Sequence, residues 1–436
     1  PDGVLVQFGG QTPLKIAEQL TNEGVKIFGT SSASIDLAEN REAFASIIKK
    51  LKIQIPEYCI AKNYEEIINF SEIAQFPVLV RPSYVLGGRA MQIVYNKEQL
   101  VDYVFRSAEA TNDHPILIDQ FIENAFEFDV DALSDGEEVF VAGIMQHIEE
   151  AGVHSGDSSC VLPPYDMSSK VKKDIIDMTT KLALELNVIG LINLQFAVKD
   201  NEVYVLEVNP RSSRTVPFVS KYSNVPLANI AAQLSVGRKI SDFNLNENRF
   251  KHTAVKKAVL PFKKFKDEKV FLGPEMKSTG EVMGIDTEPG IAFLKAMQSD
   301  GYTVPRSGTA FVSITDVDKK RALPIIKDLQ KLNFTIIATK GTAEFLLENN
   351  INCSPVFKVG EGRPNVVDEI LNDNIHLVIN TPQGAQSRYD EEAIGKTSVM
   401  KNVLTITTLA GAKAAIEAMS NMNKIRVAPL QEYFKQ

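Results

Sequence analysis

The sequence predicts a mixed α/β and α+β chain whose last part is a doubly wound α/β unit. The N-terminus has the order strand, helix, strand, and a short β-α-β unit of this kind requires parallel strands. From Pro77 onward, short apolar strands follow one another as hairpins, which is typical of an antiparallel sheet. From Gly301 to the end, apolar strands alternate with helices, and this alternation indicates a second parallel sheet.

The first part of the chain is expected to contain two strands and two helices. Pro13 is expected to begin the first helix, because the N–H that proline lacks is unpaired at that position in any case. The second helix is expected to contain Arg41. The strands are expected over residues 4–8 and 25–29, and the helices over 13–21 and 34–51.

The middle part of the chain is expected to be mainly antiparallel. Its strands are expected over residues 78–82, 91–95, 116–120, 127–132, 139–146, 192–198 and 203–208, with a long amphipathic helix over 168–186. In the last part, strands are expected over residues 309–314, 335–339, 376–380 and 403–405. Residues 301–308 are expected to link the two parts.

The composition is that of a folded globular protein. Of the 436 residues, 44% are hydrophobic and 23% are charged, which argues against disorder and against a collagen-like or disulfide-based scaffold. No apolar run approaches the ~18 residues that a membrane-spanning helix needs, and no secretory signal is visible, so no membrane partner is expected. The three cysteines are far apart and form no CxxC pair, which argues against structural zinc and favours a cytoplasmic protein.

The net charge of −8 is unevenly distributed along the chain. Residues 1–300 carry −10, and the remainder carries +2. A mildly acidic chain without basic clusters argues against nucleic acid as a partner.

The segment around Glu207 predicts a metal site. Glu207, Asn209 and Arg211 are two residues apart, so they leave an extended strand on one face. If the preceding hairpin loop holds three residues, Gln195 lies opposite Glu207 on that face, whereas a two-residue loop places it on the other. Carboxylate and amide oxygens suit Mg²⁺, whose shell substrate phosphates then complete. The alternative is a surface strand with ordinary polar alternation, and the set as a whole favours the metal.

The loop over residues 83–90 has the composition of a phosphate-binding loop. Gly87 and Gly88 would let backbone N–H groups approach phosphate oxygens, and Arg81 adds a cation at the edge of the preceding strand. The loop matches neither the P-loop nor the Rossmann fingerprint. A plain hairpin turn is an equal alternative.

The turn over residues 149–160 is rich in Gly, Ser and Asp, which ordinarily indicates a surface connection. His154 beside Ser155 and Asp157 suggests a hydrolase triad, but triad members are rarely neighbours in sequence and no GxSxG motif is present. No activating partner for Cys160 is evident. The other histidines lack metal-ligand spacing: His114, His147, His252 and His376.

A second anion site is predicted in the last part of the chain. Residues 339–342 follow a strand and open a helix, where hydroxyls and unpaired amides attract an anion. Lys319 and Lys358 would add positive charge. The alternative is simple capping of the helix by Thr342, and the local positive balance favours the anion site.

Five long motifs occur in order along the chain: VQFGGQTPLKIA, VRPSYVLGGRAMQIVY, GIMQHIEEAGVHSGDS, LEVNPRSSRTVPFVSK and LGPEMKSTGEVMG. With them the chain resembles the ATP-grasp enzymes, and specifically the C-terminal half of the carbamoyl-phosphate synthase large-chain family. The resemblance implies an ATP-grasp fold followed by a doubly wound methylglyoxal-synthase-like α/β domain. The parts it implies are a partial pre-ATP-grasp and helical region over 1–76, an ATP-grasp carbamoyl-phosphate synthetic domain over 77–300 and an allosteric domain over 301–436.

In that family the second half is an ATP-dependent ligase that phosphorylates carbamate, giving carbamoyl phosphate and ADP. It belongs to a glutamine-hydrolysing synthase that feeds arginine and pyrimidine biosynthesis. The resemblance implies ATP, two Mg²⁺ or Mn²⁺ ions per site and K⁺ as cofactors. It implies as partners the N-terminal carbamate-forming half of the large chain, the glutamine amidotransferase small chain, further copies of that heterodimer and a nucleotide effector. Because the first half and an initiator Met are absent, the chain is expected to be a fragment.

The resemblance also assigns roles to residues at matching positions. Arg41 and Arg81 would contact the nucleotide phosphates, and Glu127 would accept the ribose hydroxyls. Arg211 and Arg214 would neutralise the carbamate and the transferring phosphoryl group. The remaining nucleotide contacts would be Gln120 and Ile122 at adenine, Gly152, Val153, His154 and Ser155 along the pocket, and Gln195 and Glu207. The metal ligands would be Gln195, Glu207 and Asn209.

In the last domain the resemblance implies that four residues bind the phosphate of a nucleotide effector: Lys319, Thr339, Thr342 and Lys358. One departure concerns ornithine, which some relatives bind through an acidic side chain just before the VLPF segment. This chain has Lys256 and Lys257 there, although Glu149 and Asp157 remain. The sequence therefore argues against an intact ornithine site.

Two other functions compete with this interpretation. Another ATP-grasp ligase, such as a biotin-carboxylase-like enzyme, would share the Gln, Glu and Asn face but lack the effector domain. A regulatory module that only binds ATP would not need to keep the metal ligands together with Arg211.

Overall fold

The computed structural model describes residues 1–61, 64–82, 91–111, 115–165, 167–245, 250–261, 272–381 and 385–435, with the backbone alone at 64, 82, 106–111 and 385–389. The chain forms two compact units. The first contains Pro1–His147, Val161–Lys251 and Leu430–Gln436, and the second contains Ile148–Cys160 and His252–Pro429. None of the helices in the described residues combines the length and apolar character that a bilayer crossing requires.

The first unit begins with the predicted parallel pair, β1 (Val4–Leu5) and β2 (Ile27–Phe28). The single helix expected from Pro13 is wrong, because two short helices, α1 (Gln11–Lys15) and α2 (Ala17–Asn22), take its place. Pro13 is tolerated at the third position of α1 because the N–H groups of a first turn have no acceptor within the helix.

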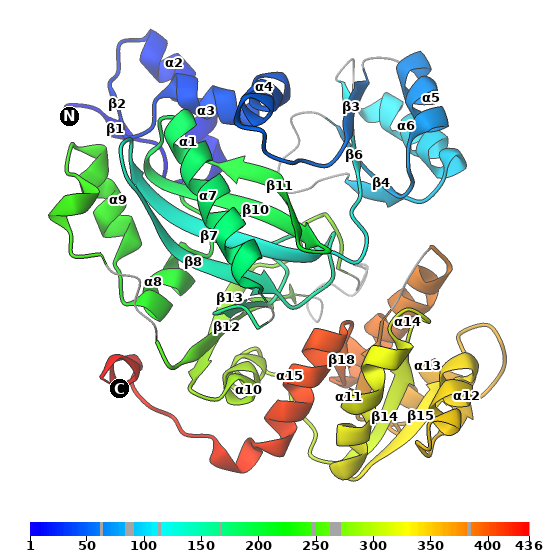
Figure 1. Ribbon diagram of the computed structural model, residues 1–436. Helices are drawn as coiled ribbons and strands as arrows, with labels where there is room; N and C mark the ends of the chain where they lie inside the picture. The colour runs from blue at the N-terminus through cyan, green and yellow to red at the C-terminus, as the bar shows by residue number, and fades with distance from the viewer. Residues whose placement is uncertain are drawn as a thin grey trace. The chain divides into compact units, whose positions relative to one another are not determined.

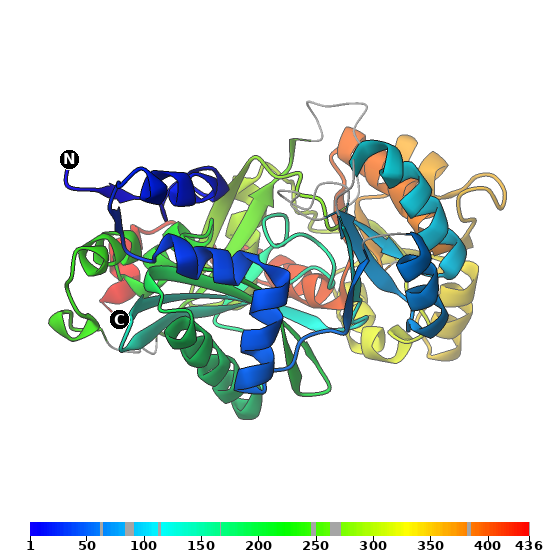
Figure 2. The same cartoon turned by 90° about the horizontal axis from the view of Figure 1, so that it is seen from above.

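The long helix expected over residues 34–51 is also wrong, because it is divided into α3 (Ser32–Glu39) and α4 (Arg41–Leu51). Asn40 separates them with an extended backbone at φ −77° and ψ 111°. Its side-chain oxygen accepts the N–H groups of Glu42 and Ala43, each at 3.1 Å, and so caps α4. Figure 2 shows α3 and α4 one after the other beside the large sheet of this unit.

A small antiparallel sheet has the order β3-β6-β4-β5. Its strands are β3 (Tyr58–Ala61), β6 (Ile116–Gln120), β4 (Val78–Pro82) and β5 (Gln92–Val94), and α5 (Tyr64–Ile73) and α6 (Lys97–Thr111) pack against it. Val80, Val94, Leu100 and Ile118 are fully buried between these layers. The predicted hairpin of β4 and β5 is confirmed, whereas its loop with Gly87 and Gly88, and also His114, lie outside the described residues.

The large sheet of the first unit has the strand order β11-β10-β7-β8-β9 (Figure 1). Its strands are β7 (Phe126–Asp135), β8 (Val139–His147), β9 (Cys160–Leu162), β10 (Ile189–Lys199) and β11 (Glu202–Asn209). Helix α7 (Ser169–Glu185) crosses one face, where Val171, Ile175 and Leu182 meet even-numbered residues such as Val130 and Leu194. The odd-numbered residues of β7 and β10 therefore lie on the opposite face. The unit continues with α8 (Val216–Ser223), α9 (Leu227–Ser235) and the 3₁₀ turn Ile240–Asp242.

The second unit contains an antiparallel hairpin, β12 (Thr253–Val259) and β13 (Gly280–Asp286), against which α10 (Pro289–Ser299) packs. Gly284 permits this packing, because a Cβ at this position would lie 2.0 Å from the carbonyl oxygen of Ala292 on α10.

The same unit contains the predicted parallel sheet, in the order β16-β15-β14-β17-β18. Its strands are β14 (Gly308–Ser313), β15 (Phe334–Thr339), β16 (Ser354–Val356), β17 (Leu377–Asn380) and β18 (Leu404–Ile406). Its helices are α11 (Lys319–Lys331), α12 (Lys340–Glu348), α13 (Val366–Leu371), α14 (Ala385–Lys401) and α15 (Leu409–Ser420), followed by a 3₁₀ turn over Met422–Lys424. The last 3₁₀ turn, Leu430–Phe434, belongs to the first unit. The sequence did not indicate β16, a short edge strand interrupted by Pro355, which an edge tolerates.

Candidate active site

The odd face of the large sheet carries polar side chains in rows that run across three strands. Two neighbouring rows cross β7, β10 and β11: first Asp131, Asn193 and Asn209, then Asp129, Gln195 and Glu207. Directly paired residues of an antiparallel sheet project on the same face. The structure thus brings together the three residues that the sequence predicted as metal ligands, and it adds Asp129 and Asp131, which the sequence analysis missed.

The pairing of Gln195 with Glu207 arises in a way that the sequence did not predict. The hairpin loop holds two residues, Asp200 and Asn201, because Lys199 pairs with Glu202. Both loop residues have positive φ values of 52° and 63°, as a type I′ turn requires.

A two-residue loop alone would place Gln195 opposite Leu206. A β-bulge between Gln195 and Phe196 shifts the register by one residue, so that Phe196 pairs with Val205 while Gln195 pairs with Glu207. Of the two loop lengths that the sequence left open, the two-residue loop is present, but the expectation that it places Gln195 on the other face is wrong because of the bulge.

The donor set of this face fits a divalent cation. The three predicted ligands offer one carboxylate, from Glu207, and the amide oxygens of Gln195 and Asn209, all hard oxygen ligands of the kind that Mg²⁺ prefers. Asn209 is buried, Gln195 is partly buried and Glu207 is exposed, so solvent reaches this face at Glu207.

The segment after β11 carries both predicted arginines; residues 210–215 are called the arginine loop below. The Arg211 side chain donates to Asn209 Oδ1 at 3.1 Å and to the Ser212 carbonyl oxygen at 3.0 Å. Burial lowers the pKa of the Arg211 guanidinium, and Glu207 acts in the opposite direction. Arg211 therefore lies within electrostatic reach of the predicted metal face, whereas Arg214 is exposed.

Asp131 holds the far end of the arginine loop. Its carboxylate is fully buried and accepts hydrogen bonds from Ser213 Oγ at 2.7 Å and from Thr215 Oγ1 at 2.6 Å. Asn193 Nδ2 donates a third at 3.0 Å. Burial raises the pKa of Asp131 to about 6, although the three hydrogen bonds partly offset this effect. The alternation of Glu127, Asp129 and Asp131 on β7 was the signal for these acids in the sequence.

Replacing Asp131 with Asn is expected to change how stability depends on pH. A pKa raised from 3.8 to about 6 means that the folded state holds its proton more tightly, so ionisation destabilises the fold as the pH rises through this window. The shift corresponds to about 3 kcal/mol. The free energy of unfolding of D131N, measured relative to the unsubstituted chain by urea titration, should therefore increase by about that amount between about pH 3 and about pH 7. A difference that does not vary with pH would contradict the assignment.

Arg41 and Arg81 come from different elements and meet at one carboxylate. Arg41 is the first residue of α4 and forms an ion pair with Asp119 of β6, and Arg81 Nη2 of β4 lies 3.3 Å from the same carboxylate. The Arg41 guanidinium also lies 5.3 Å from the ring centroid of Tyr58. The structure thus places the two predicted phosphate-binding arginines side by side, and Asp119 is a further residue that the sequence analysis missed.

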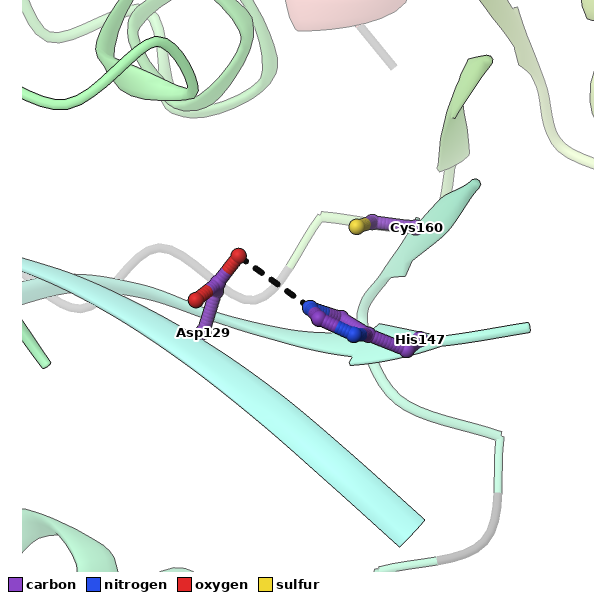
Figure 3. A group of neighbouring side chains, drawn as sticks. All are labelled: Asp129, His147 and Cys160. Carbon is purple, nitrogen blue, oxygen red and sulfur yellow. Dashed lines mark hydrogen bonds and ion pairs between the residues drawn. The ribbon is translucent and has the colours of Figure 1, made fainter. Parts of the chain in front are cut away.

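Glu127 contacts a histidine that the sequence analysis left without a role. His147 is buried, with Nδ1 at 3.3 Å from Glu127 Oε2 and Nε2 at 3.1 Å from Asp129 Oδ2. Figure 3 shows the bond between His147 and Asp129, drawn together with Cys160. A histidine between two carboxylates orients both. His147 therefore links Glu127, the predicted ribose acceptor, to Asp129, which pairs with Gln195.

Gln120 and Ile122 lie at the end of β6. The Gln120 N–H donates to the Glu57 carbonyl oxygen at 2.7 Å, and its side chain donates to Gln75 Oε1 at 3.5 Å. Gln120 also lines a cavity of about 550 Å³, which Tyr58 and Tyr204 border. Ile122 is partly buried.

In the second unit, Gly152, Val153, His154 and Ser155 form a turn that its surroundings fix. The His154 N–H donates to the Gly273 carbonyl oxygen at 2.8 Å, and His154 Nδ1 accepts the N–H of Gly156 at 3.0 Å. Both carboxylate oxygens of Asp157 accept backbone N–H groups, from Lys277 at 2.7 Å and Ser278 at 2.8 Å. The Asp157 carboxylate therefore has a structural role, which argues against the hydrolase triad.

Three of the four predicted effector residues meet at the carboxyl ends of β14 and β15. Strand order reverses at β14, and ligands of doubly wound sheets bind outside the carboxyl ends of the strands at such a point. Lys319 Nζ donates to the Gly341 carbonyl oxygen at 2.8 Å and lies 2.7 Å from Asp316.

The two threonines of this site are buried and bonded to each other, Thr339 Oγ1 to Thr342 Oγ1 at 3.2 Å. Thr342 Oγ1 also accepts the N–H of Ile314 at 3.1 Å, and no side-chain hydrogen bond caps α12. The capping alternative for Thr342 is therefore wrong. Lys358 lies in the loop after β16, where its N–H donates to Glu361 Oε2 at 3.2 Å.

The two lysines at the expected ornithine position have partners within the second unit. Lys256 is buried and donates to the Ser155 carbonyl oxygen at 3.1 Å. Lys257 lies 3.5 Å from Asp300 and 5.2 Å from the ring centroid of Tyr302, whose pKa burial raises to about 12. Glu149 accepts hydrogen bonds from the N–H and the hydroxyl of Ser159.

Three family models match successive stretches of the chain, in the order in which the sequence motifs predicted the parts. The carbamoyl phosphate synthase preATP-grasp domain matches residues 1–37, the carbamoyl-phosphate synthase L chain ATP binding domain matches residues 40–243, and the MGS-like domain matches residues 321–407. The C-terminal section of the carbamoyl phosphate synthase large chain of Aquifex aeolicus is 48% identical over 98% of this chain and 82% of its own length. The chain belongs to the carbamoyl-phosphate synthase large-chain family.

The match to longer relatives locates the chain within that family. The carbamoyl phosphate synthase large chain of Archaeoglobus fulgidus is 52% identical over all of this chain, which spans 41% of the relative's length. Together with the match to a C-terminal section, this identifies the chain as the C-terminal half of the large chain, as the motifs predicted. Membership is consistent with the predicted class, that of the ATP-dependent ligases, which is the class of the whole large chain.

Solved structures confirm the predicted ATP-grasp fold. The biotin carboxylase domain of Hydrogenobacter thermophilus 2-oxoglutarate carboxylase, in complex with MgADP and bicarbonate, has a TM-score of 0.52 and 17% identity over 60% of each chain. The biotin carboxylase of Campylobacter jejuni has a TM-score of 0.51 and 15% identity over 61% of each chain. At these identities the likeness concerns the fold alone.

Proposed function

We propose that the chain phosphorylates carbamate with ATP, giving carbamoyl phosphate and ADP, as the second catalytic half of a glutamine-hydrolysing carbamoyl-phosphate synthase. The observation that carries this proposal is the cross-strand register of Gln195 and Glu207 beside Asn209, with Arg211 bonded to that asparagine. This arrangement offers hard oxygen ligands and a guanidinium at one place, which is what phosphoryl transfer requires.

The residues of the chain have distinct parts in this reaction. Arg41 and Arg81 would bind the phosphates of ATP, and Glu127 would bind the ribose. Two Mg²⁺ ions, held by Gln195, Glu207 and Asn209, would neutralise phosphate charge when bound; Mn²⁺ and K⁺ belong to the same proposal. Arg211 and Arg214 would orient the carbamate and neutralise the phosphoryl group, so that catalysis comes from positioning and charge without a covalent protein intermediate.

The proposal is tested by the reverse partial reaction, formation of ATP from carbamoyl phosphate and ADP with Mg²⁺. It is measured on this chain alone and on a full-length large chain in which it forms the C-terminal half. ATP formation that depends on both substrates supports the proposal. Failure of the full-length chain to form ATP would refute it.

The competing ligase of the biotin-carboxylase type has the same polar face but a different acceptor. The parallel sheet with Lys319 and Thr339 at its switch point favours the synthase, because that competitor needs no such domain. A module that only binds ATP is disfavoured because Gln195, Glu207 and Arg211 all remain around one site.

The wider assembly follows from the proposed reaction. Residues 1–76 would form a partial pre-ATP-grasp and helical region, 77–300 the ATP-grasp synthetic domain and 301–436 the allosteric domain. Carbamate must be supplied by the N-terminal half of the large chain, and ammonia by a glutamine amidotransferase small chain. We infer further copies of this heterodimer as partners, a cytoplasmic location and roles in arginine and pyrimidine biosynthesis.

The allosteric domain is expected to bind a phosphorylated nucleotide through Lys319, Thr339, Thr342 and Lys358. Replacing Lys319 with Ala should weaken the binding of a nucleoside monophosphate about tenfold, because one charge-assisted hydrogen bond to phosphate is worth about 1.4 kcal/mol. Isothermal titration calorimetry measures the change. Lys331, an exposed lysine of the same helix that pairs with Asp328, provides the control K331A. Equal affinities of the two variants would contradict the site, and Lys358→Ala tests the second cation in the same way.

A further inference from the structure

The arginine loop is bonded near its start by a residue that lies far from it in sequence. Gln7, two residues after the end of β1, is fully buried in the first unit. Its side-chain Nε2 donates to the carbonyl oxygen of Pro210 at 2.9 Å, and its backbone carbonyl oxygen accepts the N–H of Ser212 at 3.0 Å. One residue thus bonds the backbone on both sides of Arg211.

A second set of bonds fixes the Gln7 side chain itself. Nε2 also donates to Thr30 Oγ1 at 2.6 Å. That hydroxyl accepts the N–H of Ile189 at 3.0 Å and donates to the carbonyl oxygen of Ile189 at 3.2 Å. Ile189 is the first residue of β10, the strand that carries Gln195. The amide of Gln7 therefore connects the arginine loop to the start of a strand of the metal face.

Two glycines lie against the side-chain amide of Gln7, where a larger residue would crowd its oxygen. Gly190 has a φ of 112°, and a Cβ at that position would lie 2.3 Å from Gln7 Oε1. Gly29 has a φ of 90°, and a Cβ there would lie 3.2 Å from the same oxygen. Two glycines with positive φ at one side chain indicate that the backbone is shaped around Gln7.

We propose that Gln7 is a positioning residue for phosphoryl transfer, which sets the backbone of Arg211 so that its guanidinium faces the metal ligands. This inference rests on the proposed function and extends the site to the N-terminal segment. With Asp131 bonded to Ser213 and Thr215, Gln7 fixes the arginine loop from its first residue to its last. A misplacement of about 1 Å in such a group costs about 100-fold in rate.

The test replaces Gln7 with Met, which keeps the length of the side chain and removes its hydrogen-bonding groups. Gln19, exposed on α2 in the same segment, provides the control Q19M. In the reverse reaction, Q7M should lower kcat about 100-fold while the KM for ADP changes less than about threefold. Q19M should match the unsubstituted chain. A kcat of Q7M equal to that of Q19M would overturn the inference.

A second measurement does not depend on activity. Hydrogen exchange of peptides that cover residues 209–215 should be about tenfold faster in Q7M than in Q19M, because the bond to Pro210 no longer restrains the loop. If the unsubstituted full-length large chain forms no ATP, the proposed function fails, and this measurement still decides whether Gln7 fixes the loop. Equal exchange in Q7M and Q19M would overturn the inference. Thermal unfolding reports whether Q7M folds, and Gln7→Asn, shorter by one methylene, replaces it in both assays if it does not.

Discussion

Replacing Glu207 with Ala is expected to lower ATP formation from carbamoyl phosphate and ADP by about 1,000-fold or more. Glu207 supplies the one carboxylate among the predicted ligands, directly opposite Gln195. Metal ions contribute several kcal/mol to the stabilisation of a charged transition state, and about 1.4 kcal/mol corresponds to a factor of ten in rate. The loss should persist at raised Mg²⁺ concentration, because two neutral amide oxygens hold a divalent cation poorly.

Glu202 provides the matched control for this variant. It lies on the same strand, is exposed and contacts Lys170 at 3.4 Å, so E202A removes a carboxylate from β11 without touching the site. E202A should react at the unsubstituted rate, and E207A should still bind a nucleoside monophosphate in the second unit. ATP formation by E207A within about tenfold of E202A would refute the assignment of Glu207.

Replacing Arg211 with Ala is expected to lower kcat of the same reaction by about 1,000-fold, the lower end of what an arginine contributes to phosphoryl transfer. Its guanidinium is held by Asn209 Oδ1 and by the Ser212 carbonyl oxygen, and Glu207 attracts it. Arg211→Lys should recover only part of the rate, because lysine keeps the charge but lacks the planar fork that binds two oxygens.

Arg238 supplies the control for Arg211. It is exposed, donates to Asp242 at 2.9 Å and lies outside the predicted site, so R238A should leave the rate unchanged. The dependence of the rate on Mg²⁺ separates two explanations for a slow R211A. An unchanged Mg²⁺ midpoint supports a direct role in phosphoryl transfer, whereas a shifted midpoint would mean that Arg211 acts by orienting Asn209.

The face of β11 could be predicted from sequence because strand geometry is local. Residues two apart on an extended strand project on one side, so Glu207, Asn209 and Arg211 form a set wherever the strand lies. The position of Gln195 could not be predicted in this way. The pairing depends on the bulge at Phe196, which no turn signal in the sequence indicates.

The residues that the sequence analysis missed are those whose partners are distant. Asp119 meets Arg41 across 78 residues, and Asp131 meets Thr215 across 84. The alternation on β7 shows which face Asp131 lies on, but neither acid's partner can be read from its own strand. Only the fold shows that Asp119 pairs with two arginines and that Asp131 holds a loop.

The sequence by itself determined the family, the two sheet types and the chemical character of the site, because motifs, alternation and residue types are written along the chain. The helix boundary at Asn40 is also a local feature, because asparagine is a preferred N-cap residue and the sequence alone could have indicated the cap. The tertiary structure alone decided which side chains meet: Gln195 with Glu207, Arg41 with Arg81, and Gln7 with the arginine loop. The physical reason is that register and long-range hydrogen bonds depend on how strands pair and pack, and short-range preferences do not encode that arrangement.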